Sequence, residues 1–248
     1  MDIINLLIIC LVGVFAGIFG TLVGGGGLIT VPTLIFIGLP PHVAIATNRL
    51  GAVGLFATGW YKFHKKGTID YRVGMITGIP FFIGSILGAF LLLEISEEDL
   101  RKFIAAFTVA VLVIIMAKSN IGLEKRKSVT QKYELIVGII LSFGIGVYAG
   151  FYTPGFGIFL SYVQILLFGQ TFIESAGTWK IGAVMYSVAT SVLFALKGLI
   201  VYPDAVALFI GTASGSYVGA HYSDRIGNVW IRRLFIVSVL ALALKLIV

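Results

Sequence analysis

The sequence predicts an all-α integral membrane protein built from two homologous helical repeats. Three observations lead to this fold class: a series of long apolar segments, a register of matching residues between the two halves, and glycine-rich interruptions at corresponding places. The chain has 248 residues, of which 58% are hydrophobic and 12% are charged. Its mean hydropathy is +1.05. Such a composition is typical of chains that cross a lipid bilayer several times, not of soluble domains.

Apolar segments follow one another along the chain, and most are near the length of about 20 residues that a helix needs to span the bilayer. The eight clear ones are residues 3–23, 43–63, 73–93, 103–117, 135–152, 173–196, 206–220 and 234–248. Two shorter ones, residues 28–37 and 158–168, come directly after glycine-rich interruptions. Their length is typical of half-helices or re-entrant segments.

A comparison of the sequence with itself indicates an internal duplication. Gly38 matches Gly169, and 169 − 38 = 131. The same offset pairs Thr47 with Thr178, Gly51-Ala52-Val53 with Gly182-Ala183-Val184, Lys66-Gly67 with Lys197-Gly198, Tyr71 with Tyr202, Gly84-Ser85 with Gly215-Ser216, Gly88-Ala89 with Gly219-Ala220, and Arg101 with Arg232. Further upstream, Ala16-Gly17 matches Ala149-Gly150 and Gly24 matches Gly157 at an offset of 133, which implies two extra residues in the first glycine loop.

The charged residues indicate how the halves are oriented. The net charge of +7 comes mostly from connecting segments, where Lys and Arg mark cytoplasmic loops, so no nucleic-acid partner is needed to explain it. Residues 62–72 are basic while their counterpart 197–204 holds one Lys; residues 94–102 are mainly acidic while their counterpart 221–233 is basic. This change of side favours inverted repeats of five plus five crossings. The alternative is four plus four crossings with re-entrant short segments and repeats that run in the same direction. It fits the short lengths better and the charges worse.

The strongest basic stretch, residues 118–132, predicts a cytoplasmic linker between the repeats. We therefore divide the chain into a first transmembrane repeat (residues 1–117), the linker (118–132) and a second transmembrane repeat (133–248). The small-xxx-small pairs Gly13/Gly17, Gly84/Gly88 and Gly215/Gly219 predict close helix packing within this bundle.

Interruptions of an apolar segment at equivalent places in two repeats are the sequence feature that points to a transporter's binding site. Here they are residues 20–27, with four consecutive glycines, and residues 153–157, with Pro154 between Thr153 and Gly155. A helix broken inside hydrocarbon leaves backbone groups without partners, so such breaks persist where they face protein, water or a ligand. We expect the two half-helices to present their free N–H groups to one central cavity.

Each half also places a cation at the same position of an apolar segment. Arg49 lies in Thr47-Asn48-Arg49 and its repeat mate is Lys180, in Thr178-Trp179-Lys180. A cation beside the N–H groups of a broken helix suits an anionic ligand. The other interpretation is that both cations lie near helix ends and extend to the membrane interface.

The sequence offers no catalytic or metal site. Ser214 precedes His221 by seven residues, which is about 10.5 Å along a helix and too far for a nucleophile and its base. No HExxH pattern, Cys pair or carboxylate cluster provides metal ligands, and residues 20–27 lack the Lys-Ser/Thr of a phosphate-binding loop. We therefore predict a protein that is not an enzyme and has no cofactor.

Two motifs carry a resemblance to a known family. Residues 16–32, the downstream Ala44-x-x-Thr47-Asn48, and residues 150–157 resemble the TauE/SafE family of sulfite exporters, and the similarity covers nearly the whole chain. The second half departs from the fuller glycine run of the family and has Pro-Gly-Phe-Gly. The resemblance implies a multi-pass permease of the cytoplasmic membrane for small sulfur-containing anions such as sulfite, thiosulfate or sulfonates.

We therefore expect a secondary transporter that works by alternating access between the repeats. The predicted substrate-binding residues are Gly24, Gly25, Gly26, Gly27, Thr47, Asn48, Arg49, Thr153, Gly155, Gly157, Thr178 and Lys180. The alternatives are an anion channel on the same scaffold and a non-transporting membrane assembly subunit. The expected partners are the lipid bilayer and a small anion; coupling to protons or sodium, and a homodimer, stay open.

Overall fold

The computed structural model describes residues 3–94, 96 and 132–247, and this part of the chain consists of helices and connecting turns without strands. The predicted span 103–117 and all of the predicted linker except Lys132 lie outside the described residues. The helices are α1 (Ile3–Val23), α2 (Gly27–Phe36), α3 (Pro41–Lys65), α4 (Tyr71–Glu94), α6 (Lys132–Phe151), α7 (Phe156–Phe168), α8 (Phe172–Thr178), α9 (Lys180–Leu196) and α10 (Tyr202–Ile247).

Several helices have the length and hydropathy of membrane spans. Among the described residues these are α1, α4, α6 and the 25-residue stretch Phe172–Leu196, which comprises α8 and α9. The predicted half-helices are confirmed as the short apolar helices α2 and α7. The two spans expected at residues 206–220 and 234–248 belong to α10, which bends at Gly227, where φ is 71°.

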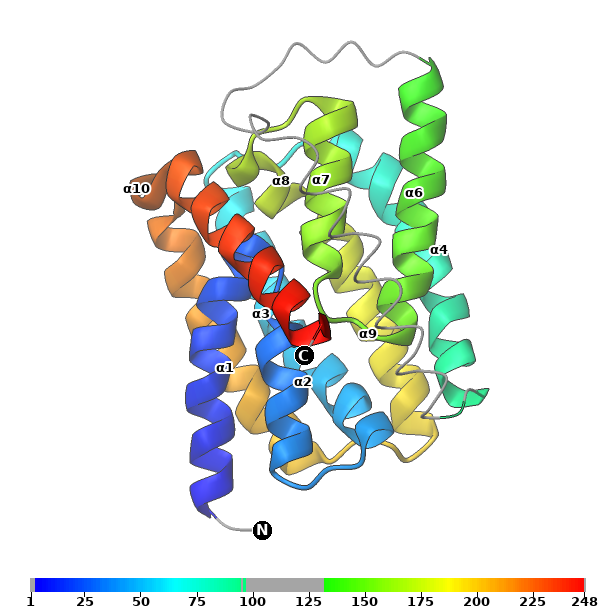
Figure 1. Cartoon of the computed structure of the whole chain (residues 1–248), viewed down its shortest axis with the longest axis vertical. Coiled ribbons are helices and arrows are strands. Elements are labelled where there is room, and N and C mark those ends of the chain that lie inside the picture. Colours follow the sequence, from blue (N-terminus) through cyan, green and yellow to red (C-terminus); the bar gives the residue numbers. More distant parts are fainter. Residues whose placement is uncertain (1–2, 95, 97–131, 248) are drawn as a thin grey trace.

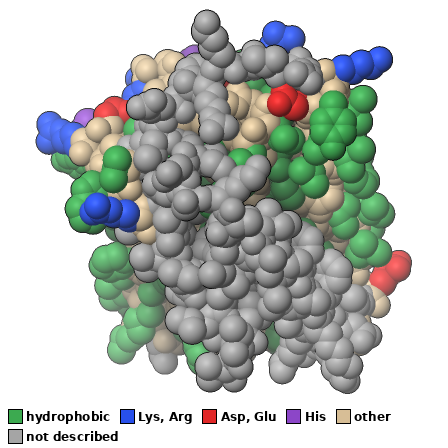
Figure 2. Space-filling model, turned by 45° about the horizontal axis from the view of Figure 1, so that its top comes forward, with side chains coloured by type: hydrophobic (Ala, Val, Ile, Leu, Met, Phe, Trp, Pro, Cys, Tyr) green, Lys and Arg blue, Asp and Glu red, His purple; other side chains and the backbone are tan. Residues whose placement is uncertain are grey.

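The outer surface of the bundle is apolar. On α1, Ile4, Leu11 and Phe15 are each more than 60% exposed. Figure 2 shows such hydrophobic side chains along the flanks of the molecule, with Lys and Arg side chains gathered towards its upper part. Soluble proteins rarely expose apolar surface of this extent, and lipid is the solvent that it fits. The fold is therefore that of an all-helical integral membrane protein.

Positive backbone angles fall at equivalent positions of the two halves. Gly24 (φ 89°) ends α1 and Gly155 (φ 82°) precedes α7, and 155 − 24 = 131. Two further pairs with positive φ, Gly38 with Gly169 and Gly67 with Gly198, have the same offset. At the breaks the correspondence is not exact, because Thr153 also has a positive φ of 78° whereas Leu22, 131 residues earlier, lies within α1. Both breaks nevertheless contain a glycine with positive φ.

When α8 and α9 are counted as one helix, the first helix of each half packs against the fourth helix of the other half. α1 packs against α10, and α6 packs against α4. In Figure 1, α1 begins at the bottom and runs upward, whereas α6 begins at the top and runs downward. Opposite directions are what inverted halves require. The arrangement in two inverted repeats stays a prediction, which these observations support.

Glycine makes both of these helix contacts close, as predicted from the small-xxx-small pairs. A Cβ built on Gly17 of α1 would lie 2.5 Å from the Thr212 carbonyl oxygen of α10. On the other side, a Cβ at Gly88 of α4 would clash with the Val147 carbonyl of α6, and one at Gly146 of α6 with the Phe81 carbonyl of α4. Small residues let the backbones approach to this distance, and no larger side chain fits.

Two glycines of α6 provide a matched test of this packing. We expect Gly146→Ala to destabilise the protein by about 1–3 kcal/mol, because the added methyl group meets backbone that cannot rotate away. A Cβ at Gly144, on the same helix, would meet nothing within 4 Å. Gly144→Ala should therefore leave stability unchanged or slightly raised. Thermal unfolding of the purified variants in detergent measures both, and equal midpoints would contradict the packing assignment.

Candidate functional site

The two glycine-containing breaks meet in the interior of the bundle. A Cβ built on Gly24 would lie 2.5 Å from the carbonyl carbon of Gly157, and one built on Gly157 would lie 2.7 Å from the Cα of Gly24. The breaks are therefore in backbone contact, and any side chain at either position would force them apart. This is the meeting of half-helices that the sequence predicted.

A small cavity lies beside this contact. Its volume is about 20 Å³, which is room for about one water molecule. It is lined by Gly20, Gly24, Gly26, Gly27, Thr30, Asn48, Ala52, Leu55, Phe56, Thr153, Phe156 and Thr212. Five of the predicted site residues are among them: Gly24, Gly26, Gly27, Asn48 and Thr153. The other seven do not line it: Gly25, Thr47, Arg49, Gly155, Gly157, Thr178 and Lys180.

The cavity is rich in free hydrogen-bond donors. Gly26 and Gly27, which line the cavity, lie at the start of α2, and within the described residues their backbone N–H groups have no acceptor. Asn48 is 1% exposed. Its Oδ1 accepts a hydrogen bond from the Thr30 hydroxyl at 2.5 Å, and its Nδ2 has no partner in the described part of the chain. Free N–H groups at a helix N-terminus favour an anion.

The two buried cations are bound to carbonyl groups at the ends of broken helices. Arg49 Nη2 donates to the Gly150 carbonyl of α6 at 2.6 Å. The helical partner of that carbonyl would be residue 154, which is proline and has no N–H. Lys180 Nζ donates at 3.1 Å to the Thr21 carbonyl, close to the end of α1. Each cation thus satisfies a carbonyl group that the helix break leaves unpaired.

Each of the two cations forms a hydrogen bond that crosses between the halves, and Lys180 also donates to the Ala176 carbonyl of its own half at 2.8 Å. Arg49 belongs to the first half and its acceptor to the second, while Lys180 belongs to the second half and Thr21 to the first. Both side chains are fully buried. The guanidinium of Arg49 lies 5.0 Å from the Tyr186 ring centroid, and Lys180 Nζ lies 4.1 Å from the Trp179 ring centroid. The cations therefore flank the cavity without entering it.

The two predicted threonines also make equivalent contacts that cross between the halves. The Thr47 hydroxyl oxygen accepts a hydrogen bond from the N–H of Val201 at 3.1 Å, and that of Thr178 accepts one from the N–H of Asp70 at 3.1 Å. Val201 directly precedes α10 and Asp70 directly precedes α4. The offsets are equal, since 178 − 47 = 131 and 201 − 70 = 131. These hydroxyls thus pair with the N–H groups of the residues that directly precede α10 and α4, and they lie outside the cavity wall.

The sequence reading missed part of the wall. Ala52, Leu55 and Phe56 follow Asn48 on α3 at intervals of about one and two helical turns. This spacing could have identified them once Asn48 was chosen. Phe56 also packs against Phe156 of α7, with ring centroids 5.6 Å apart. The described residues contain no group of three or more His, Cys, Asp or Glu side chains that could hold a metal ion.

The fold and site define an integral membrane protein in which two interrupted helices meet at a buried cavity. The chain belongs to the sulfite exporter TauE/SafE family, which residues 9–246 match. A Haemophilus influenzae relative named "Probable membrane transporter protein" is 30% identical over 249 residues, covering 100% of this chain and 97% of its own. The protein is accordingly a membrane transporter, not an enzyme.

More distant relatives have similar printed names. "Probable membrane transporter protein YfcA" of Escherichia coli K12 is 24% identical over 236 residues, which cover 95% of this chain and 87% of the relative. "Probable membrane transporter protein YdhB" of Bacillus subtilis 168 is 25% identical over 227 residues, which cover 90% and 91%. No solved structure gives a significant match.

The role of the two cations can be tested by stability. We expect Arg49→Gln and Lys180→Gln each to lower the free energy of unfolding by about 1–3 kcal/mol, because a buried carbonyl loses its donor. Lys197→Gln is the control, since Lys197 is exposed. Thermal unfolding without added anion is the measurement. Unchanged stability in both variants would mean that the cations do not serve the helix ends.

Proposed function

We propose that this protein is a secondary transporter of the cell membrane that moves small sulfur-containing anions, such as sulfite, thiosulfate or sulfonates. The observation that carries the proposal is the chemistry of the cavity wall. Its unpaired groups are the N–H groups at the start of α2 and the amide nitrogen of Asn48. Among the described residues, no Asp or Glu lines the cavity. Such a wall suits a solute that accepts hydrogen bonds and carries negative charge.

The surrounding charges favour the same kind of solute. Arg49 and Lys180 are fully buried on either side of the meeting helices, and within the described residues neither forms a salt bridge with a carboxylate. Two positive charges in a medium of low dielectric constant create a field that a bound anion relieves. Sulfur oxyanions offer several oxygens on one small centre, which matches donors that converge from two helices. The family to which the chain belongs is described as a sulfite exporter family.

Alternating access between the halves is the transport mechanism that we propose. The cavity has room for about one water molecule, so a larger oxyanion requires the walls to move apart. Arg49, Lys180, Thr47 and Thr178 each form a hydrogen bond that joins one half to the other. Movement of one half against the other would therefore open the cavity without unfolding either half.

Asn48 is the residue to test. Asn48→Asp keeps the volume and the acceptor for the Thr30 hydroxyl, but replaces the free donor with a carboxylate oxygen. In proteoliposomes loaded with sulfite, thiosulfate or a small sulfonate, we expect KM to rise by about tenfold or more, as the loss of a hydrogen bond to a charged group predicts. Flux with and without an imposed pH gradient shows whether proton movement is coupled.

Thr33→Val is the matched control, because Thr33 is also on α2 and its hydroxyl donates to the Ile29 carbonyl at 2.7 Å, outside the cavity. Its KM should equal that of the parent. No flux of any of the three anions by the parent would refute the substrate class. Conductance that follows the anion gradient alone, at rates far above those of a carrier, would favour the channel. An unchanged KM in Asn48→Asp would remove Asn48 from the site.

A further inference from the structure

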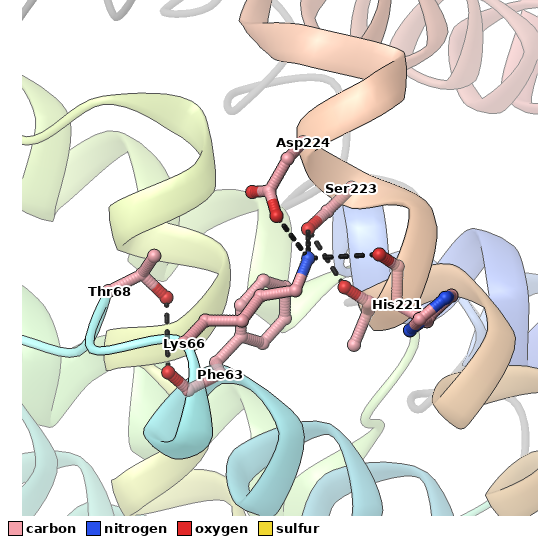
Figure 3. A network of polar contacts seen from close by, with 7 residues as sticks. Phe63, Lys66, Thr68, His221, Ser223 and Asp224 are labelled. Carbon is pink, nitrogen blue, oxygen red and sulfur yellow. Dashed lines mark hydrogen bonds and ion pairs between the residues drawn. The ribbon is translucent and has the colours of Figure 1, made fainter.

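An ionic contact joins the two halves at one face of the bundle. Lys66 directly follows α3, and its ammonium group has three acceptors on α10 (Figure 3). They are the His221 carbonyl at 3.0 Å, the Ser223 hydroxyl at 3.0 Å and the Asp224 carboxylate at 2.5 Å. An ammonium group has three protons, so all of its donors are used. We call this contact the Lys66 latch.

An apolar cluster lies beneath the latch. Phe63, Ala176 and Ala220 bring α3, α8 and α10 together, and all three are 2% exposed or less. We call these three residues the Phe63 cluster. Lys180 Nζ lies 5.2 Å from the Phe63 ring centroid, and the same ammonium donates to the Thr21 carbonyl beside cavity residue Gly20. From the surface inward, the order is therefore latch, apolar cluster, buried cation and cavity.

The same inner layers occur on the other side of the cavity. Phe194, Ile45 and Ala89 belong to one buried apolar cluster, which we call the Phe194 cluster. These residues are the repeat mates of the Phe63 cluster, since 194 − 63, 176 − 45 and 220 − 89 all equal 131. Arg49, the mate of Lys180, lies 6.0 Å from the Phe194 ring centroid. Each apolar cluster thus covers one of the two buried cations.

The two sides differ in the outermost layer. Lys197 is the repeat mate of Lys66, but it is exposed, and its ammonium contacts no acceptor in the described part of the chain. The positions equivalent to Ser223 and Asp224 are Leu92 and Leu93, because both differ by 131. The duplicated scaffold therefore has two equivalent apolar barriers, of which one carries an ionic contact across the halves.

We propose that the Phe63 and Phe194 clusters are the two gates of the cavity, and that the Lys66 latch holds the Phe63 gate closed. The proposal rests on the alternating access proposed above. To open the Phe63 gate, α3 must separate from α10, which breaks the latch. Opening of the Phe194 gate breaks no equivalent ionic contact within the described part of the chain. The latch therefore biases the protein towards the state in which the Phe63 side is closed.

The position and exposure of the latch suit this role. It joins the basic segments 62–72 and 221–233, which the positive-inside rule places on the cytoplasmic side. Its side chains are partly solvated, with exposed fractions of 19% for Lys66 and 60% for Asp224. An ion pair of this kind contributes modestly, so it can break and form again in each transport cycle.

The test measures access to the cavity from each side of the membrane. The reporter is Ala52→Cys, on the cavity wall, in a Cys10→Ser background that removes the single native cysteine. Right-side-out and inside-out vesicles are treated with a membrane-impermeant maleimide. We expect Lys66→Gln and Asp224→Asn to raise the labelling rate about fivefold in inside-out vesicles, as release of one exposed ion pair predicts. Labelling in right-side-out vesicles should fall or stay the same.

Two further variants make the test specific. Lys197→Gln removes the equivalent charge on the other side and should leave labelling at the parent rate. The exchange Lys66→Glu with Asp224→Lys restores an ion pair and should return the rate towards that of the parent. The proposal is overturned if neither neutralising variant raises labelling, or if Lys197→Gln raises it equally. Labelling needs no substrate, so the latch can be confirmed even if none of the sulfur anions is transported.

Discussion

The structure depends on one constraint: backbone groups freed by a helix break inside a membrane protein must find partners. α1 and α6 both end in mid-bundle, and both leave carbonyl groups without helical donors. The protein uses buried side-chain cations for these carbonyls, and leaves the N–H groups at the start of α2 free. The carbonyl groups at the ends of α1 and α6 thus have hydrogen-bond donors, whereas the N–H groups at the start of α2 stay available to a ligand. This difference is the basis on which we propose an anionic substrate.

The same constraint explains why the halves are interleaved. The partner of each broken end comes from the opposite half, as do the hydroxyls of Thr47 and Thr178 that accept from the N–H groups before α10 and α4. A contact between two residues is thus repeated between their repeat mates. An interface with this property is self-complementary, as in a two-fold symmetric dimer. The symmetry is incomplete where function needs a direction: Asn48 lines the cavity while its mate Trp179 packs against Phe56.

Much of the fold could be predicted from the sequence, because hydropathy, glycine clusters and a constant offset are local or periodic signals. The geometry of the candidate site was predicted in part. The meeting of Gly24 with Gly157 and the place of Asn48 follow from the breaks and the repeat. The partners of Arg49 and Lys180 do not, because a charge pattern cannot distinguish a ligand from a carbonyl in the other half. For Arg49 the sequence did contain one signal: Pro154 has no N–H, so the Gly150 carbonyl needs another donor.

The exchange of buried cations has a consequence for biosynthesis. Arg49 is synthesised about a hundred residues before Gly150, so the nascent first half enters the membrane with a guanidinium whose acceptor does not yet exist. A buried charge without a partner is costly in lipid. The first half must therefore keep Arg49 in contact with water or with insertion machinery until α6 arrives. Neither half would then be a self-sufficient folding unit, although the sequences of the two halves match at a constant offset.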